Sequence, residues 1–225
     1  ARLLDGGVAP DGRPYLVLEY VEGEPLTTYC DARGLDVAAR LRLLLAVADA
    51  TGSAHRQLVV HRDLKPSNIL VGHDGRPRLL DFGVATILDP SSAAPVARRR
   101  RMTPEYAAPE QFDGAPATTA TDVYQLGAVL YELLSGHRPF ERGPSGEDAL
   151  ERRVRHTDPP PPSAHRPALR GDLDAVVLKA LRKEPRARYA SVAELAADVQ
   201  RLLDGEPVAA RAGDRAYRWR RTARR

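Results

Sequence analysis

His61-Arg-Asp-Leu-Lys-Pro-Ser-Asn-Ile-Leu70 is the part of this 225-residue sequence that decides its fold, because it combines a carboxylate, a cation and an amide in one polar loop. Two further motifs follow it, Leu80-Asp-Phe-Gly83 and Thr103-Pro-Glu-Tyr-Ala-Ala-Pro-Glu110. All three lie in a region of about sixty residues that is dominated by loops, and loops of that length are usually functional or disordered. We therefore expect the chemistry of the protein in this region.

The polar side chains of these motifs suit one kind of reaction. Asp63, Asn68 and Asp81 form an oxygen-rich set that favours Mg²⁺ and phosphate over softer metals. Phosphoryl transfer needs a carboxylate facing the acceptor hydroxyl, oxygen ligands for Mg²⁺ and a cation near the moving phosphoryl group. Asp63 can be that carboxylate, while Asn68 and Asp81 can be the ligands. Lys65 supplies the cation, so the residue types predict a phosphoryl-transfer centre.

Four segments outside these loops have the apolar spacing of helices with one buried face. The last of them begins with a capping box, Ser191-Val-Ala-Glu194, and stops at Gly205. Four such faces can close a helical core. Their apolar positions are Leu41, Leu44, Leu45 and Ala48 after Asp36; Val123, Leu126, Gly127, Leu130, Leu133 and Leu134 after Thr121 and Asp122; Leu173, Val176, Val177, Ala180 and Leu181; and Val192, Leu195, Ala196, Val199, Leu202 and Leu203.

The first twenty residues indicate β structure instead. Arg2-Leu-Leu4 is followed by a turn-rich run from Gly6 to Gly12 and then by the apolar strand Tyr15–Tyr20. Two strands alone are marginally stable in water. We therefore expect residues 1–20 to be poorly ordered, or to pair an open strand edge with another chain.

The three motifs, in this order, resemble those of the eukaryotic-type serine/threonine protein kinases, and of bacterial members in particular. The resemblance covers roughly residues 1–203. It implies the protein kinase fold (α+β), represented mainly by the helical C-lobe with a remnant of the strands of the N-lobe and the hinge. We accordingly expect an N-lobe remnant at 1–20, the hinge and C-lobe at 21–204, and a basic tail or linker at 205–225.

The resemblance also implies roles for single residues. Asp63 matches the aspartate that orients the substrate hydroxyl and accepts its proton, and Lys65 matches the lysine that contacts the γ-phosphate of ATP. Thr103 matches the threonine that bridges to both. Asn68 and Asp81 match the two Mg²⁺ ligands.

Binding of adenine and support of the catalytic loop have counterparts as well. Residues 18–21 resemble the gatekeeper and hinge, where Glu19 and Val21 would read adenine through backbone groups. Leu70 resembles the apolar floor beneath the base. Three further matches are structural or regulatory: Phe82 and Gly83, which complete the switch motif; Asp122, which holds the catalytic-loop backbone; and the buried ion pair of Glu110 and Arg188, which braces the substrate-binding loop.

Four consecutive arginines, Arg98 to Arg101, precede Thr103. They form either a solvated loop or, together with Arg62, a receptor for a phosphate carried by the same loop. Ser91 and Ser92 are the nearest hydroxyls upstream.

Two parts of a complete kinase site have no match in this chain. No Gly-x-Gly-x-x-Gly motif precedes the hinge, and no lysine precedes Lys65. We expect a fragment of a kinase that transfers the γ-phosphate of ATP, with Mg²⁺, to serine or threonine of proteins, with little activity on its own. The alternative is a non-catalytic pseudokinase or scaffold built on the C-lobe. A kinase of small molecules is disfavoured by the segment Thr103–Glu110, which shapes a protein-substrate site.

Composition narrows the setting and the partners. A single cysteine, Cys30, excludes an internal disulfide framework, and no stretch has the length of a membrane span or the order of a signal peptide. We expect a cytoplasmic protein, or the cytosolic part of a membrane-anchored kinase. The pI is about 9.4, but the last 15 residues hold seven arginines and one aspartate, which leaves the remaining 210 at −2. No nucleic-acid partner is therefore expected.

The basic tail and a proline run each leave two interpretations open. Arginines around Tyr217 and Trp219 could contact an anionic membrane surface, or the tail could be a solvated linker. Pro159–Pro162 could be a polyproline II ligand, but a stiff connection between two helices is favoured.

Overall fold

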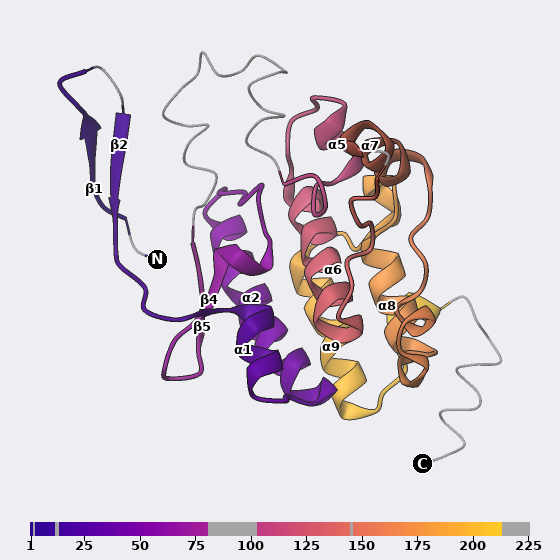
Figure 1. Ribbon diagram of the computed structural model, residues 1–225. Helices are drawn as coiled ribbons and strands as arrows, with labels where there is room; N and C mark the ends of the chain where they lie inside the picture. Colours follow the sequence, from indigo (N-terminus) through magenta and orange to yellow (C-terminus); the bar gives the residue numbers. More distant parts are fainter. Residues whose placement is uncertain (2, 12–13, 81–102, 145, 213–225) are drawn as a thin grey trace.

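The computed structural model describes residues 1, 3–11, 14–80, 103–144 and 146–212, which form a helical body and an N-terminal β-hairpin (Figure 1). Four helices of the body are those that the apolar spacing predicts: α2 (Val37–Arg56), α6 (Thr119–Ser135), α8 (Asp172–Ala180) and α9 (Val192–Asp204). α6 runs through the middle of the body and packs against α2, α8 and α9. The predicted helical core is therefore present.

Local capping fixes the ends of these helices. The side chain of Asp36 accepts a hydrogen bond from the amide of Ala39 at 2.7 Å and begins α2. Ser191 does the same for α9 through the amide of Glu194 at 3.2 Å, and Gly205 ends that helix in the left-handed conformation with φ 69°. Such caps satisfy backbone groups that the helix itself leaves unpaired.

Gly127 occupies a position in the predicted apolar face of α6 because α6 and α8 approach each other closely there. A Cβ atom on Gly127 of α6 would lie 2.7 Å from the Cβ of Ala180 on α8. No larger residue fits there without moving the helices apart. The glycine therefore sets the spacing of the core.

Among the described residues, three helices were not predicted from the sequence: α1 (Leu26–Ala32), α5 (Pro109–Phe112) and α7 (Gly146–His156). α7 is the longest of them, yet it buries only Leu150 and Val154. Two apolar positions give too weak a period to be noticed among charged neighbours. Short 3₁₀ turns complete the body, at Pro66–Asn68, Pro162–Ala164, Pro167–Leu169, Pro185–Ala187 and Ala209–Arg211.

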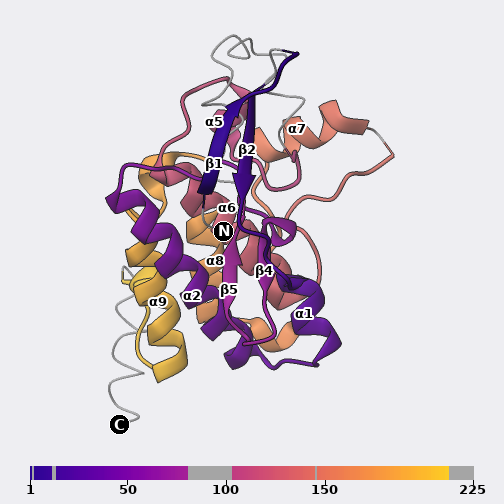
Figure 2. The ribbon, with the colours of Figure 1, turned by 90° about the vertical axis from the view of Figure 1, so that its left-hand side faces the viewer.

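A small antiparallel sheet links the segment after Val21 to the residues that follow Asn68. It consists of β3 (Glu24–Pro25), β4 (Ile69–Val71) and β5 (Pro77–Leu79), and Pro25 pairs with Leu70. β5 packs on α2 and β4 on α1 (Figure 2). Gly23 lies so close to β4 that a Cβ atom on it would be 2.7 Å from the Val71 carbonyl oxygen.

The N-terminal hairpin consists of β1 (Leu3–Val8) and β2 (Pro14–Leu18), which pair antiparallel. β1 continues through Gly6 and Gly7, where the sequence predicted a turn. Gly7 pairs with Tyr15, whose ring covers it closely: a Cβ atom on Gly7 would lie 2.9 Å from the Tyr15 hydroxyl. An aromatic neighbour across the ladder compensates for the weak strand preference of glycine.

The hairpin leaves both expectations for residues 1–20 open. Its described residues pair with each other, and the poor order expected for this segment stays a prediction. Among the described strands, β1 and β2 form a sheet of their own, with both outer edges unpaired. Pairing of those edges with another chain stays a prediction.

The proline run packs as a connection. Pro159 and Pro162 are buried, whereas Pro160 and Pro161 are exposed. A polyproline II helix repeats every three residues, so the face shared by Pro159 and Pro162 is already used. This arrangement favours the stiff connection between α7 and α8.

Residues 206–212, within the predicted tail, pack against the end of the body. Val208 is buried, and the amides of Ala209 and Ala210 donate to the carboxylate of Asp198 at 2.7 and 2.8 Å. The hydroxyl of Tyr189 donates to the same carboxylate at 2.9 Å. Burial alone would raise the pKa of Asp198, but these donors and Arg201 outweigh it, so the pKa lies below its usual value.

The rest of the predicted tail, residues 213–225, lies outside the described residues. So do Asp81, Phe82 and Gly83, the serines 91 and 92, and Arg98 to Arg101. In the described ranges, no helix combines the length and the apolar character that a membrane span requires.

Candidate active site

A buried carboxylate on α6 holds the loop that contains Asp63. Asp122 is fully buried, and its two oxygens accept the amides of His61 and Arg62, each at 2.8 Å. His55 of α2 contacts the same carboxylate at 2.7 Å. Arg62 has a left-handed backbone with φ 74°, a conformation that costs energy for a residue with a side chain. The bonds to Asp122 offset that cost and present Asp63 to solvent.

Two glutamines that the sequence analysis missed complete this support. Gln125 of α6 is buried; it accepts the amide of Leu64 at 2.9 Å and donates to the carbonyl of Arg62 at 2.8 Å. Gln111 of α5 donates to the same carbonyl at 3.0 Å and accepts from Gln125 at 3.0 Å. One feature of the sequence could have indicated Gln125: it is a polar residue within the apolar run of α6, one helical turn after Asp122.

Four of the predicted site residues lie together in front of this support. The ammonium of Lys65 lies 2.7 Å from Asp63 Oδ2 and 2.6 Å from the Thr103 hydroxyl. Asn68 Nδ2 donates to the backbone carbonyl of Asp63 at 2.9 Å and to its Oδ2 at 3.1 Å. Thr103, far away in the sequence, thus reaches the loop that carries Asp63 and Lys65.

The chain just before Asp81 passes next to Asn68. Leu80 is the last described residue of that segment, and its amide donates to the Asn68 carbonyl at 2.9 Å. The Leu80 carbonyl lies 2.8 Å from His61 Nε2. These two bonds fix the backbone from which Asp81 follows, although Asp81 itself lies outside the described residues.

His61 is a buried structural histidine of this loop. Burial lowers the pKa of His61 below its usual value, although the carboxylate of Asp122 opposes the shift. The ring is therefore neutral near pH 7 and serves to connect the loop to Leu80.

The donor set near Asp63 fits Mg²⁺ in its chemistry. Asn68 is 8% exposed, and the bonds described for its side chain use Nδ2, which leaves the amide oxygen as a ligand. Amide and carboxylate oxygens are the ligands that this ion prefers.

The residues proposed to read adenine lie at the junction of hairpin and body. Leu70 is half-buried on β4, and Val21 leads into β3, the strand that pairs with β4. Glu19 follows β2 directly and is exposed. The small sheet therefore brings Leu70 and the segment after Val21 together, while Glu19 lies at the base of the hairpin.

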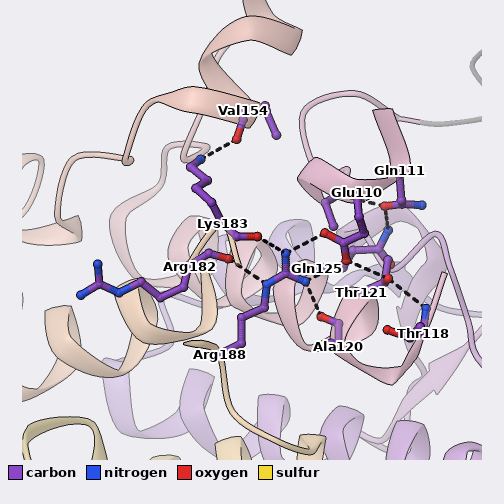
Figure 3. Close-up of polar contacts among 11 residues, drawn as sticks. Glu110, Gln111, Thr118, Ala120, Thr121, Gln125, Val154, Arg182, Lys183 and Arg188 are labelled. Carbon is purple, nitrogen blue, oxygen red and sulfur yellow. Dashed lines mark hydrogen bonds and ion pairs between the residues drawn. The ribbon is translucent and has the colours of Figure 1, made fainter. Parts of the chain in front are cut away.

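The predicted pair of Glu110 and Arg188 forms a two-pronged ion pair (Figure 3). The guanidinium donates to the two carboxylate oxygens at 2.8 and 2.7 Å, and Arg188 is 4% exposed. Its remaining donors reach the backbone carbonyls of Ala120, Arg182 and Lys183, each at 2.8 Å. Every donor of the guanidinium is thus used, as a buried charge requires.

This pair keeps Glu110 charged. Burial disfavours the carboxylate, but the hydrogen bonds from Arg188 and Thr121 outweigh it, so the pKa of Glu110 lies below its usual value. The pair ties α5, and with it the end of Thr103–Glu110, to the turn before α9.

Comparison with known proteins identifies the class. The protein kinase domain family matches residues 6–199, so the chain belongs to this family. The expected kinase fold, mostly helical with few strands, is therefore confirmed. Members of the family in general use ATP and Mg²⁺.

Its relatives include bacterial serine/threonine-protein kinases, as the motifs predicted. PknB of Mycobacterium tuberculosis is 39% identical over 196 residues, which are 86% of this chain and 31% of the relative. PrkC of Bacillus subtilis is 36% identical over 197 residues, 85% of this chain and 29% of the relative. Pkn1 of Myxococcus xanthus is 40% identical over 185 residues, 80% of this chain and 26% of the relative. The chain thus spans about a third of the length of these relatives or less.

Proposed function

We propose that the chain carries the catalytic loop of a serine/threonine protein kinase, which transfers the γ-phosphate of ATP to serine or threonine hydroxyls of proteins. The observation that carries this proposal is the position of the Lys65 ammonium between Asp63 and Thr103, at 2.7 and 2.6 Å. A carboxylate, a cation and a hydroxyl in contact match the demands of phosphoryl transfer, which depends on positioning and charge.

The roles follow from the chemistry of each group. Asp63 is exposed enough to meet a substrate, and its carboxylate would orient the incoming hydroxyl and take its proton. Lys65 would stabilise negative charge on the phosphoryl group as it moves. Thr103 holds the lysine and links the catalytic loop to the substrate-binding segment that Glu110 and Arg188 anchor.

Metal and nucleotide binding rest on fewer described residues. Asn68 and Asp81 would hold Mg²⁺, which neutralises charge on the phosphates when bound. Leu70 would lie under the adenine ring, with Glu19 and Val21 at its edge. Phe82 and Gly83 would act as the switch that positions Asp81.

Arg62 is the described candidate for a regulatory contact. Its Nε atom is buried and has no hydrogen-bond partner among the described residues. A phosphate on the segment before Thr103 would supply that partner, together with Arg98 to Arg101.

The test supplies the parts that this chain does not contain. The part of PknB that precedes its region of similarity to this chain is fused ahead of Ala1, and phosphorylation of a generic basic protein is measured with ATP and Mg²⁺. We expect phosphorylation on serine or threonine, reduced at least about 100-fold by Asp63→Asn. A folded chimaera that binds ATP and yet phosphorylates nothing would contradict the proposal.

A non-catalytic scaffold built on the C-lobe is the second candidate. Thermal shift of the unfused chain with ATP and Mg²⁺ separates the two. Stabilisation that Asn68→Ala removes would favour retained nucleotide binding. No stabilisation of the chain or of the chimaera would favour the scaffold.

We propose the cytoplasm as the setting, with the tail at an anionic membrane surface. Arg211 pairs with Asp172 at 3.1 Å and belongs to the body. A truncated variant that tests the tail should therefore lack only residues 213–225. Co-sedimentation with phosphatidylserine vesicles should fall on truncation and at high salt. Equal sedimentation of both forms would identify the tail as a plain linker.

A further inference from the structure

The side-chain amides of Gln111 on α5 and Gln125 on α6 meet at the backbone of the loop that carries Asp63. They contact each other at 3.0 Å (Figure 3), and both donate to the carbonyl oxygen of Arg62, at 3.0 and 2.8 Å. This carbonyl belongs to the peptide group that joins Arg62 to Asp63. Gln125 also accepts the amide of Leu64, at 2.9 Å. The two amides therefore hold the backbone on both sides of Asp63.

Gln111 has a further contact, with the predicted substrate-binding segment Thr103–Glu110. Its Oε1 accepts the amide of Ala108 at 2.9 Å, and Ala108 is fully buried. Ala108 is the residue at which α5 begins, so this bond also caps the helix. A single side chain thus joins the backbone of the segment to the peptide group next to Asp63.

Backbone chemistry fixes which way each amide points. A backbone N–H can only donate and a carbonyl can only accept, so Gln125 must turn Oε1 to Leu64 and Nε2 to Arg62. The same rule turns Oε1 of Gln111 to Ala108 and its Nε2 to Arg62. Gln125 is 1% exposed, so solvent cannot replace its bonds. Glutamate has the length of glutamine but no donor, and it cannot make the same set of bonds.

We propose that Gln111 and Gln125 are positioning residues, which couple the segment Thr103–Glu110 to the orientation of Asp63. The inference rests on the proposed function, in which this segment binds the protein substrate and Asp63 orients its hydroxyl. Arg62 has a left-handed backbone, so its peptide group is held by hydrogen bonds and not by its own conformational preference. A shift of the segment moves Gln111, changes its bond to the Arg62 carbonyl and turns the peptide group that carries Asp63. Small displacements of a group at the reacting centre have large effects on rate, because the reaction requires a near-ideal geometry.

Three substitutions separate this coupling from simple support of the fold. Gln111→Glu keeps an acceptor for the Ala108 amide and removes the donor to Arg62, whose carbonyl oxygen then faces a carboxylate oxygen. Gln111→Met removes both bonds. Gln200→Glu makes the first change at an exposed glutamine of α9 and is the control.

The first test uses the whole 225-residue chain and needs no kinase activity. Hydrogen exchange of single amides is measured by NMR. In Gln111→Glu we expect the amide of Leu64, which Gln111 does not contact, to exchange at least about fivefold faster. The reason is that Gln125 cannot follow the displaced Arg62 carbonyl and also keep its bond to Leu64. The amide of Ala108 should change less than about twofold in this variant, and both amides should exchange faster in Gln111→Met. An unchanged rate at Leu64 in Gln111→Glu, or an equal acceleration at both amides, overturns the proposal.

The second test measures kinetics in the chimaera with the N-terminal part of PknB. We expect Gln111→Glu to lower kcat at least about tenfold and to change KM for the protein substrate less than about threefold, because binding is kept while Asp63 is misplaced. Its melting temperature should stay within about 2 °C of the parent. An unchanged kcat, or a loss that Gln200→Glu matches, would contradict the coupling. An inactive parent chimaera contradicts the proposed function instead, and the exchange rates then decide the coupling by themselves.

Discussion

The apolar side chains of the N-terminal hairpin are largely exposed to solvent, whereas those of α6 are buried in the core. In the hairpin, Leu4 and Val8 are 58% and 69% exposed, whereas Leu126 and Val129 of α6 are fully buried. Two strands cannot bury an apolar face by themselves, while a helix surrounded by three others buries nearly all of its residues. The body therefore has a core that can keep it stable without the hairpin. The hairpin has no core of its own to stabilise it.

The largest expected effect tests the body at its buried ion pair. Arg188→Ala leaves Glu110 charged and without its partner, so we expect the free energy of unfolding to fall by about 3–5 kcal/mol. Urea unfolding measures this change. Arg186→Ala, at an exposed arginine of the same turn, is the control and should change little. Similar losses in both variants would show that the pair is not what braces the body.

Acid should weaken the body in two steps. Since the pKa of His61 is lowered by folding, its contribution is complete above pH 6.5, the ordinary value, and is lost as pH falls below it. The pKa values of Glu110 and Asp198 are also lowered, so their contributions are lost at lower pH, as pH falls through their folded values.

The measurement is the free energy of unfolding between pH 8 and pH 3. One proton accounts for a slope of at most about 1.4 kcal/mol per pH unit. His61→Gln should flatten the first step and leave the second in place. An unchanged first step in that variant would assign it to another group.

A smaller effect, of opposite sign, is expected at the end of α2. Leu58 is 93% exposed and has a left-handed backbone with φ 60°. Glycine adopts this conformation without strain, so Leu58→Gly should stabilise the chain by about 1 kcal/mol. Leu58→Ala keeps the strain and should give no gain. Equal gains from both would indicate that the exposed leucine, rather than the backbone, is unfavourable.

The smallest effect is expected for the hairpin itself. Removal of residues 1–20 takes away apolar side chains that are mostly exposed, so the melting temperature of the body should shift by no more than about 2 °C. Circular dichroism at the helical signal measures it. A shift much larger than this would mean that the hairpin stabilises the body, and the contrast between the two regions would fail.

Prediction from sequence worked where the cause is local. The capping box at Ser191 and the apolar periods of α2, α6 and α9 placed three helices, because neighbours along the chain decide both features. It failed for α7, whose only buried residues are Leu150 and Val154, and for Gly6 and Gly7, where strand pairing prevailed over the preference for a turn.

The candidate site divides in the same way. Asp63, Lys65 and Asn68 are close in sequence, and their chemical types already indicated phosphate and Mg²⁺. Gln111 gave no signal and Gln125 gave only that of an amide in an apolar run, because an amide becomes part of the support only when packing brings it to the Arg62 carbonyl.

By itself, the sequence determined the kinase family, the helices with strong apolar periods and the residue types of the catalytic loop. The tertiary structure alone decided which distant groups share a charge or a hydrogen bond: Asp122 with the loop amides, Thr103 with Lys65, and Val154 with Lys183. The physical reason is that burial and pairing depend on neighbours far apart along the chain, and a linear pattern does not specify which of them will meet.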